Sequence, residues 1–377
     1  DYSELDERAT ILASVLVAQG IGKEDIVGVL LPRSPEMIVA ILAVLKAGSA
    51  WLPLDLSYPI ERIQYMLNNS QARLILCEKE VSQHYGITMT ALDPDDAVKN
   101  ITAQELGDIG DPKDLAYLNF TSGSTGLPKG VQVEQGSLAN FLVGMARALD
   151  WVPESRIACL TTVSFDIFIL ESLLCLSQGG CIVLADEKET VDPVSIARII
   201  KEGQVDYLQM TPTRLQLLLS NERALADVLG EIKTLIIGGE PFPNQLLPVF
   251  DKFESLRVFN VYGPTETCVW STCKEMTKTK NVSIGSPIDN TQVYILDDCL
   301  HMVPPGVEGD LWISGLGVAR GYINNPELTA ERFVDNPFGE GKMYRTGDRA
   351  LWNGNELECR GRDDGQVVAA LAESNGQ

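Results

Sequence analysis

The stretch YLQMTPTRLQLLL, Tyr207 to Leu219, decides the fold class, because in it a short apolar run passes directly into a helical pattern. It predicts a strand over Tyr207–Met210 and a helix over Thr213–Leu219. Near-continuous apolar strands that alternate with helices are typical of layered, mostly parallel sheets with flanking helices. We therefore predict an α/β fold. The further strands and helices predicted on the same grounds cover Ile26–Leu31, Pro35–Leu45 (helix), Leu74–Cys77, Ile157–Leu160, Cys181–Ala185, Asp192–Ile200 (helix), Leu235–Ile237 and Val258–Val261.

The pattern changes after residue 282. Short strands are predicted among turn residues, with little helix between them, at Val293–Leu296, Asp310–Ile313 and Glu356–Arg360. This predicts a small antiparallel, β-barrel-like subdomain after the α/β layers. The predicted domains are residues 1–281 for the α/β layers, 282–363 for the β-rich subdomain and 364–377 for a hinge remnant and tail.

The composition limits the partners. The 377 residues include 52 acidic and 30 basic side chains, and the resulting charge of −22 argues against a nucleic-acid partner. The longest apolar run, Met37 to Leu45, is far below the roughly 20 residues that span a bilayer, so we expect no membrane partner. The eight cysteines form no CxxC pair and there are two histidines, so we see no zinc pattern and expect buried, reduced thiols in a cytoplasmic protein.

A glycine- and hydroxyl-rich loop follows a predicted strand. Thr121 to Gly130, TSGSTGLPKG, combines three glycines, four hydroxyl side chains and Lys129. Small residues let backbone amides approach phosphate oxygens, and a lysine adds a point charge. The loop is not a Walker A motif, because Lys129 is not followed by Ser or Thr. It predicts a phosphate-binding loop, with an ordinary surface turn as the alternative.

Two further segments carry candidate chemistry. NVYGPTET, Asn260 to Thr267, follows a predicted strand, and Glu266 there could bind Mg²⁺ through a carboxylate oxygen. The alternative is a Gly-Pro turn with Thr265 as a helix cap. YRTGD, Tyr344 to Asp348, offers a carboxylate for both hydroxyls of a ribose, although Thr-Gly-Asp is also common in turns.

In order along the chain, these segments resemble the adenylation domains of nonribosomal peptide synthetases, which belong to the adenylate-forming enzymes. LKAGSAWLPLD, Leu45 to Asp55, and Tyr58 to Ile63 are similar to one core motif of that family. Seven motifs match in the family's order. The others are Leu118–Gly130, Asn260–Glu266, Gly309–Gly321, Glu327–Phe333, Tyr344–Asp348 and Gly361-Arg362.

The resemblance implies that an amino acid and ATP react to give an aminoacyl adenylate and pyrophosphate. The aminoacyl group then passes to the phosphopantetheine thiol of a carrier protein. The implied catalytic residues are Thr121, Lys129 and Glu266, with Glu266 as the Mg²⁺ ligand. The implied nucleotide contacts are Thr121, Ser122, Gly123, Ser124, Thr125, Gly126, Lys129, Asn260, Tyr262, Gly263, Thr265, Asp348 and Arg362.

Substrate choice is expected to lie in SFDIFILE, Ser164 to Glu171, where Asp166 matches the family's aspartate for the substrate ammonium. A carboxylate in an apolar run is costly to bury without a cationic partner, although Asp166 could instead cap a helix. The implied pocket resembles the family's glycine type, whereas from the residues alone its members could be ordinary core. They are Asp166, Ile167, Leu170, Gln209, Ile236, Gly238, Val261, Val269 and Trp270.

The chain departs from the family after Val367. The family continues into a C-terminal subdomain of about 100 residues that holds a further lysine, whereas this sequence stops at Gln377. We expect a trimmed or interrupted domain that forms adenylate slowly. Expected partners are a peptidyl carrier protein, neighbouring synthetase domains and a small activating protein, in antibiotic or secondary-metabolite synthesis. The alternatives are an acyl- or aryl-CoA ligase and a noncatalytic nucleotide-binding module.

Overall fold

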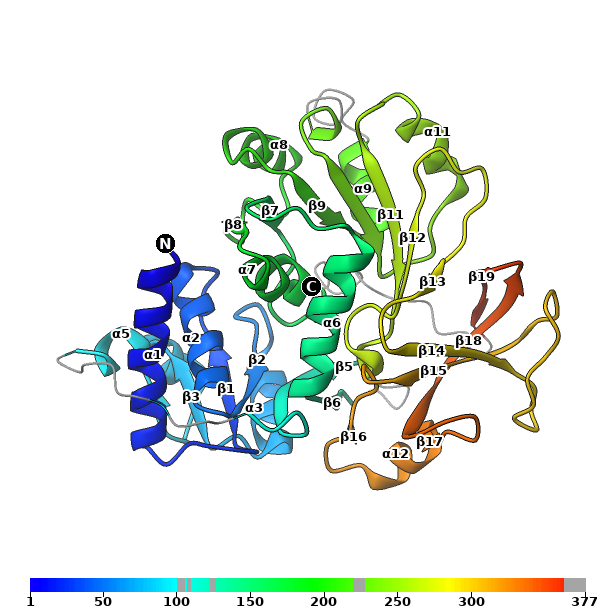
Figure 1. Ribbon diagram of the computed structural model, residues 1–377. Helices are drawn as coiled ribbons and strands as arrows, with labels where there is room; N and C mark the ends of the chain where they lie inside the picture. The colour runs from blue at the N-terminus through cyan, green and yellow to red at the C-terminus, as the bar shows by residue number, and fades with distance from the viewer. Residues whose placement is uncertain (100–105, 107–109, 123–126, 220–227, 363–377) are drawn as a thin grey trace. The chain divides into compact units, whose positions relative to one another are not determined.

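The computed structural model describes residues 1–99, 106, 110–122, 127–219 and 228–362 (Figure 1). These residues fall into two compact units. Each unit is built from three separate segments of the chain. Unit 1 comprises Asp1–Ala139, Thr162–Phe168 and Ala319–Glu331, and unit 2 comprises Asn140–Thr161, Ile169–Val318 and Arg332–Gln377. The domain boundaries proposed at residues 281 and 363 stay predictions, and the tail 364–377 lies outside the described residues.

Unit 1 is built on a seven-stranded sheet of order β16-β6-β5-β2-β1-β3-β4. Neighbouring strands from β4 to β5 are parallel, and β6 and β16 are antiparallel to their neighbours. The strands are β1 (Ile26–Leu30), β2 (Ala50–Pro53), β3 (Leu74–Cys77), β4 (Ala91–Leu92), β5 (Leu115–Thr121), β6 (Lys129–Glu134) and β16 (Gly321–Tyr322). The helices are α1 (Tyr2–Ala18), α2 (Pro35–Lys46), α3 (Ile60–Ser70), α4 (Lys79–His84), α5 (Pro94–Ala97) and α12 (Pro326–Arg332).

Helix α2 illustrates why the predicted elements form. The Ser34 side chain accepts a hydrogen bond from the amide of Met37, and Pro35 occupies the first turn, where no backbone donor is needed. Met37, Ile41 and Val44 recur at helical spacing and are buried. The predicted helix Pro35–Leu45 is thereby confirmed, and the observed helix ends one residue later, at Lys46. In the described residues, no helix has the length and apolar character that crossing a bilayer requires.

Unit 2 contains a second seven-stranded sheet, of order β13-β12-β11-β10-β9-β7-β8. The strands from β8 to β11 are parallel, and β12 and β13 are antiparallel. They are β7 (Arg156–Cys159), β8 (Cys181–Leu184), β9 (Tyr207–Met210), β10 (Thr234–Gly238), β11 (Arg257–Tyr262), β12 (Thr272–Glu275) and β13 (Ser286–Pro287). The helical segments are the π-helix η1 (Leu170–Leu174), α7 (Cys175–Ser177), α8 (Pro193–Glu202), α9 (Pro212–Leu219), η2 (Asn244–Leu246), α11 (Leu247–Phe250) and η3 (Thr265–Thr267). Helix α6 (Gln135–Ala148) begins in unit 1 and continues in unit 2.

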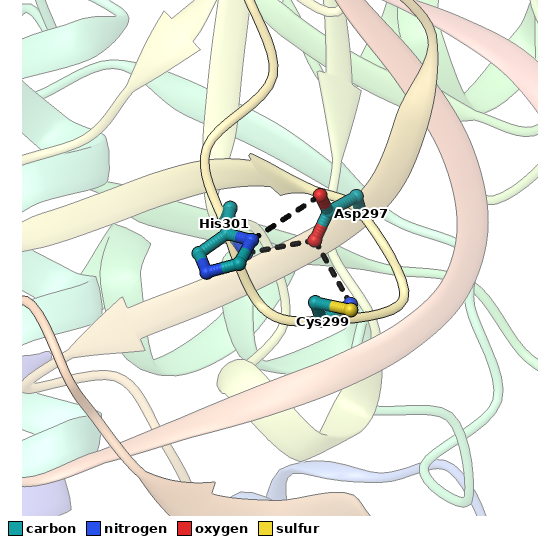
Figure 2. A group of neighbouring side chains, drawn as sticks. All are labelled: Asp297, Cys299 and His301. Atoms are coloured by element: carbon teal, nitrogen blue, oxygen red, sulfur yellow. Dashed lines mark hydrogen bonds and ion pairs between the residues drawn. The ribbon is translucent and has the colours of Figure 1, made fainter.

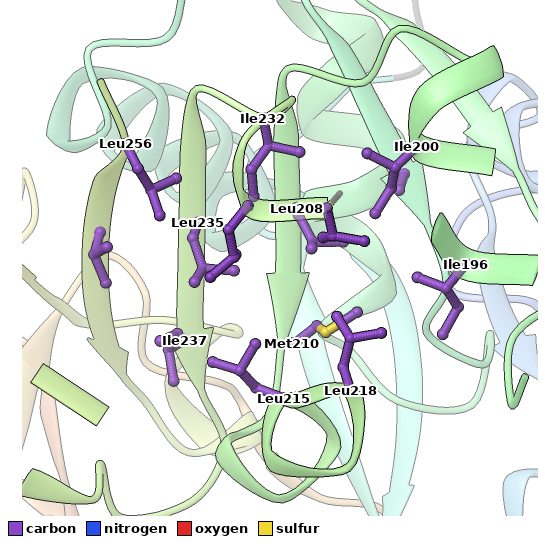
Figure 3. Packing of buried hydrophobic residues seen from close by; sticks show 14 of the residues in the cluster. Ile196, Ile200, Leu208, Met210, Leu215, Leu218, Ile232, Leu235, Ile237 and Leu256 are labelled. Carbon is purple, nitrogen blue, oxygen red and sulfur yellow. The ribbon is translucent and has the colours of Figure 1, made fainter. Parts of the chain in front are cut away.

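One face of this sheet forms the main core of unit 2. Leu208, Leu235 and Ile237 point from β9 and β10 toward apolar side chains of α8 and α9 (Figure 3). Register pairs Leu235 with Leu208 on one side and with Val258 on the other, so these side chains share one face. The alternate residues of the same strands therefore lie on the opposite face.

A third, wholly antiparallel sheet completes unit 2, with the order β14-β15-β18-β17 and with β19 paired to β18. Its strands are β14 (Thr291–Leu296), β15 (Gly309–Gly315), β17 (Phe333–Asp335), β18 (Lys342–Asn353) and β19 (Glu356–Arg362). The predicted fold class, layered mostly parallel sheets followed by a small antiparallel sheet, is confirmed.

The cysteines correct one expectation. All eight are free, and Cys77 and Cys175 are buried, which raises the pKa of their thiols to about 11 and about 12. However, Cys181, Cys299 and Cys359 are exposed, so the prediction of buried thiols is wrong for these three. Cys181 and Cys359 lie on strands, where side chains alternate between two faces, and Cys299 lies on the turn after β14, so neither setting buries the thiol.

Candidate functional site

In unit 1, strands β5 and β6 form the stem of the predicted phosphate loop. Thr121 pairs with Lys129 across this hairpin. The Lys129 ammonium donates a hydrogen bond of 3.1 Å to the Tyr322 hydroxyl and lies 4.7 Å from the centre of that ring. The Thr121 hydroxyl is shielded from solvent and, among the described residues, has no hydrogen-bond partner. A cation and a hydroxyl donor at the stem fit a phosphate group chemically.

The rest of that loop is only partly described. Ser122 is exposed, as a residue that meets a ligand from solvent would be. Gly123, Ser124, Thr125 and Gly126 lie outside the described residues.

Asp166 lies in a turn that other residues of unit 1 support. It is half-buried, and its Oδ2 atom is inaccessible to solvent. Two residues earlier, the Ser164 hydroxyl accepts a hydrogen bond of 2.8 Å from the phenol of Tyr58. Thr162 donates to the carboxylate of Asp55, and the Arg62 guanidinium lies 3.8 Å from the centre of the Tyr58 ring. The core motif around residues 55–62 therefore holds the turn with Asp166 and Ile167, a contact that the sequence analysis did not predict.

In unit 2, three predicted nucleotide contacts come together. The Tyr262 phenol donates to Oδ2 of Asp348, and Arg362 forms an ion pair of 3.5 Å with Oδ1 of the same carboxylate. Asp348 and Arg362 are register partners on β18 and β19. Burial and the neighbouring Asp348 charge raise the pKa of the Tyr262 phenol well above its usual range, so it stays a donor. A carboxylate held by a phenol and a guanidinium fits the hydroxyl groups of a ribose chemically.

The loop after β11 carries the candidate metal ligand. Glu266 is buried in η3, and Gly263 and Thr265 are half-buried. Carboxylate oxygen is the donor type that Mg²⁺ prefers, so Glu266 fits the metal by its chemistry. The side chain of Asn260, a predicted nucleotide contact, donates a hydrogen bond of 2.7 Å to the carbonyl of Ser283 and so ties β11 to that segment.

Seven predicted pocket residues belong to unit 2, and all are buried. Gln209, Ile236 and Val261 lie on the sheet face opposite the main core, because Ile236 pairs with Gln209, and Gly238 pairs with Val261. They are Leu170, Gln209, Ile236, Gly238, Val261, Val269 and Trp270. Burial alone fits ordinary core as well as a pocket wall. The four strand residues Gln209, Ile236, Gly238 and Val261 are separated from the main core, because they lie on the opposite face of the sheet.

Close packing explains one glycine of this set, Gly238, and one of the loop after β11, Gly263. A Cβ atom at Gly238 would lie 2.6 Å from Cγ2 of Val261 and 2.8 Å from Cη2 of Trp270. A Cβ atom at Gly263 would lie 2.6 Å from the Cα of Trp270. Both separations are too short for any side chain without a shift of the neighbours. The Trp270 ring therefore closes over Gly238, while its backbone packs on the loop after β11.

The segment leading to Trp270 is strained. Cys268 and Val269 have φ angles of 64° and 65°, in the left-handed region. A β-branched residue is rarely found there, and such a conformation costs on the order of 1–3 kcal/mol. The contacts of the surrounding structure therefore have to hold this turn in its strained conformation. Its conformation sets where the Trp270 side chain begins.

Glu171 is a buried residue that the sequence analysis quoted without assigning a role. Its carboxylate accepts hydrogen bonds from the amides of Leu160 and Thr161, both at 2.8 Å, and from the Thr161 hydroxyl at 2.6 Å. The signal that could have identified it is a single charge in an otherwise apolar helical run, which burial permits only with full hydrogen bonding.

The structure also groups three metal-ligating side chains that the sequence analysis did not recognise as a pattern. Asp297, Cys299 and His301 lie on the turn after β14, and one ligand atom from each falls within 4.8 Å of the others (Figure 2). Oδ1 of Asp297 accepts hydrogen bonds of 2.9 Å from the amides of Cys299 and His301. These bonds lower the pKa of Asp297. All three residues are exposed, and the hydrogen bonds of the turn account for their proximity.

The fold and these clusters define a class. The chain belongs to the AMP-binding enzyme family, whose sequence profile matches residues 1–323. It is 41% identical over 381 residues to the dimodular nonribosomal peptide synthase of Bacillus subtilis (strain 168), covering 97% of this chain and 16% of the relative. It is 38% identical to tyrocidine synthase 1 of Brevibacillus parabrevis, covering 97% of this chain and 34% of that protein. The chain thus spans well under half the length of these relatives.

Solved structures agree. The holo form of AB3403, a four-domain nonribosomal peptide synthetase bound to AMP and glycine, superposes with a TM-score of 0.87 at 33% identity, covering 97% of this chain and 27% of that one. The N-terminal subdomain of Klebsiella oxytoca NpsA, in complex with 3-hydroxybenzoyl-AMSN, gives 0.86 at 27% identity, covering 96% and 93%. The resemblance to adenylation domains of nonribosomal peptide synthetases is confirmed.

Proposed function

We propose that this chain activates a small amino acid, glycine in the first place, as its aminoacyl adenylate. A carboxylate oxygen of the amino acid attacks the α-phosphorus of ATP, the bond to the bridging oxygen of the β-phosphate breaks, and pyrophosphate leaves. The nucleophile is already ionised at neutral pH, so no strong base is needed. The observation that carries the proposal is the cluster of Tyr262, Asp348 and Arg362, a carboxylate held ready for a ribose.

The proposal gives the other residues charge-neutralising and positioning roles. Thr121 and Lys129 bind the β- and γ-phosphates as charge moves onto the leaving group, together with the loop residues 122–126. Glu266 would hold Mg²⁺, which would supply positive charge to neutralise the phosphates, and Asn260, Gly263 and Thr265 shape the nucleotide loop. These roles need positioning and electrostatic stabilisation, which are the main sources of catalysis in phosphoryl chemistry.

Glycine is proposed because the wall leaves little room for a side chain. The side chains of Trp270 and Val261 already fill the space next to Gly238. A substrate with a side chain larger than that of glycine would have to displace them. Asp166 is assigned to the substrate ammonium, with Ile167 beside it. A relative at 33% identity that was solved with AMP and glycine adds support. The following step is proposed to be thioester formation with the phosphopantetheine of a carrier protein in a cytoplasmic synthetase, with a small activating protein as a further partner.

Binding tests this without requiring turnover. Glycyl, alanyl, phenylalanyl and 3-hydroxybenzoyl conjugates of sulfamoyl-adenosine, stable mimics of the adenylates, are titrated into the 377-residue chain by calorimetry. We expect the glycyl compound to bind tightest. The alanyl compound should bind about 10- to 200-fold more weakly, the range that one methylene confers in an apolar pocket.

Two variants serve as controls. Asp348→Asn should weaken every conjugate, because it alters the part that all of them share. Asp166→Asn should weaken the amino-acid conjugates and spare the 3-hydroxybenzoyl one, which has no ammonium. Preference of the unaltered chain for the 3-hydroxybenzoyl compound would point to an aryl-acid ligase and overturn the amino-acid assignment.

A further inference from the structure

We call the face of β9–β11 that carries Gln209, Ile236, Gly238 and Val261 the pocket face of unit 2. A buried polar chain crosses it, from the π-helix η1 to Trp270. Glu171 is 0% exposed and Gln209 is 2% exposed, so water does not compensate their polar atoms. Placing a carboxylate in such surroundings is unfavourable unless its oxygens are hydrogen-bonded. The buried Glu171 carboxylate therefore depends on the donors around it.

Glu171 is anchored at one end by the segment that follows β7. Three donors from Leu160 and Thr161 occupy its oxygens, as described above. A fourth donor comes from the next strand, since Nε2 of Gln209 lies 3.3 Å from Oε1 of Glu171. The carboxylate thus joins the end of β7 to a pocket-facing side chain of β9.

The chemistry of the two neighbours permits only one orientation of the Gln209 amide. A carboxylate only accepts hydrogen bonds, so Nε2 of Gln209 must face Glu171. The indole of Trp270 only donates, so Oε1 of Gln209 must face its Nε1, and the distance is 3.2 Å. A rotated amide would place two acceptors together at one end and two donors together at the other.

This orientation bears on substrate size through the position of the indole. Cη2 of Trp270 occupies the space beside Gly238, 2.8 Å from where a Cβ atom would stand. The strained turn at Cys268 and Val269 sets where the side chain begins. The hydrogen bond that Nε1 donates to Oε1 of Gln209 holds the other edge of the ring. With both ends held, the ring cannot swing away from Gly238 without breaking that bond.

We propose that Glu171 and Gln209 are positioning residues for substrate size. They hold the Trp270 indole over Gly238, and in this way they maintain the exclusion of amino acids larger than glycine. This rests on the proposed glycine-activating function and deepens it. Neither residue needs to touch the substrate, because both act through the indole.

The first measurement follows the indole directly and needs no substrate. The chain has five tryptophans, so a ¹H–¹⁵N spectrum shows five indole signals, and Trp270→Phe identifies the one from Trp270. Gln209→Leu removes the acceptor of the Trp270 indole N–H and should shift the Trp270 indole signal upfield. Glu171→Gln should shift it too, because the new amide donor turns the Gln209 amide around and sets its NH₂ group against the indole N–H. Gln216→Leu, the same change at an exposed site on α9, should leave it in place.

The second measurement is the ratio of affinities for the glycyl and alanyl conjugates of sulfamoyl-adenosine. Loss of the acceptor in Gln209→Leu should narrow that ratio by about tenfold, since a freed ring admits one methyl group. Trp270→Phe replaces the bicyclic indole by a smaller phenyl ring, so it removes both the donor and the Cη2 edge over Gly238, and it should narrow the ratio in the same direction. General structural damage would weaken both conjugates equally and leave the ratio unchanged.

The outcomes separate the two proposals. An unchanged Trp270 signal in Gln209→Leu, or an unchanged affinity ratio in a folded variant, would overturn the positioning role. If the unaltered chain does not prefer the glycyl conjugate, the proposed substrate is wrong, and the indole signals still decide whether Glu171 and Gln209 position Trp270.

Discussion

The two faces of strands β9–β11 in unit 2 are made by alternate residues of the same short segments, yet they obey different rules. One face carries Leu208, Leu235 and Ile237 in a wholly apolar cluster. The other face carries Gln209 and Gly238. The neighbours of Gln209 fix its hydrogen bonds, and the neighbours of Gly238 leave no volume for a side chain. The core face requires volume and apolarity, and several side chains meet that requirement. The pocket face requires specific donors, acceptors and clearances, so few substitutions are compatible with it.

The largest effect is expected on the pocket face, from Trp270→Ala. Truncating a buried aromatic ring should lower the free energy of unfolding by about 3–5 kcal/mol. Because the ring also covers Gly238, the variant should bind alanyl and larger conjugates better relative to the glycyl one. Urea denaturation and calorimetry measure the two effects. A stability loss with an unchanged order of conjugates would show that the two faces do not differ in the way proposed.

Ile237→Ala makes the matching change on the core face. It should lower the free energy of unfolding by about 2–5 kcal/mol, through lost apolar burial and the cavity left behind. The folded variant should keep the affinity ratio of the glycyl and alanyl conjugates. A changed ratio, measured where the variant is fully folded, would mean that the core face also sets specificity.

Gly238→Ala adds a methyl group one residue further along the same strand. The new Cβ meets both a side chain and the carbonyl oxygen of Val261, 2.8 Å away, and backbone cannot yield easily. Overpacking of this kind typically costs about 1–3 kcal/mol of stability. Affinity for the glycyl conjugate should fall as well, whereas Ile237→Val, an alteration of similar size on the core face, should leave it unchanged. Undiminished glycyl binding by Gly238→Ala would remove this residue from the pocket wall.

The smallest effect on stability is expected from an ion pair at the start of β11. It lies on the pocket face, at the end of the strand opposite to Val261. The Arg257 guanidinium, 3.0 Å from a carboxylate oxygen of Glu275, lowers the pKa of that carboxyl below its ordinary 4.5. A lowered folded-state pKa stabilises the protein above pH 4.5, and the contribution is lost as pH falls through the folded-state value. Both side chains are more than a third exposed, so the pair should contribute at most about 1 kcal/mol.

Comparing the unaltered chain with Glu275→Gln by urea denaturation from pH 7 to pH 3 isolates this contribution. The difference in unfolding free energy should shrink toward acid and toward high salt. The affinity ratio of the conjugates should not change at any pH. A pH-independent difference would contradict the ion-pair explanation.

Much of the fold was predictable from local patterns. The strands Leu74–Cys77 and Tyr207–Met210 lie where the sequence predicts them, and the helix starting at Pro35 begins at the predicted residue. These elements depend on apolar runs, caps and breakers within a few residues of each other, and such signals are present in the chain before it folds. The ligand-binding motifs are equally local, so their residue types could be assigned to phosphate, metal and ribose chemistry.

Which face of a strand joins the main core, and which face carries the predicted pocket residues, was decided only by the tertiary structure. Both faces of β10 are apolar in sequence, and nothing local separates Ile236 from Ile237. The same holds for the contacts of Glu171, and for the pair of Gln209 and Trp270, which are 61 residues apart. Burial follows average hydrophobicity, which a short window of sequence reports. A hydrogen bond depends on the distance and direction between two particular atoms, and for remote residues only the folded chain sets these.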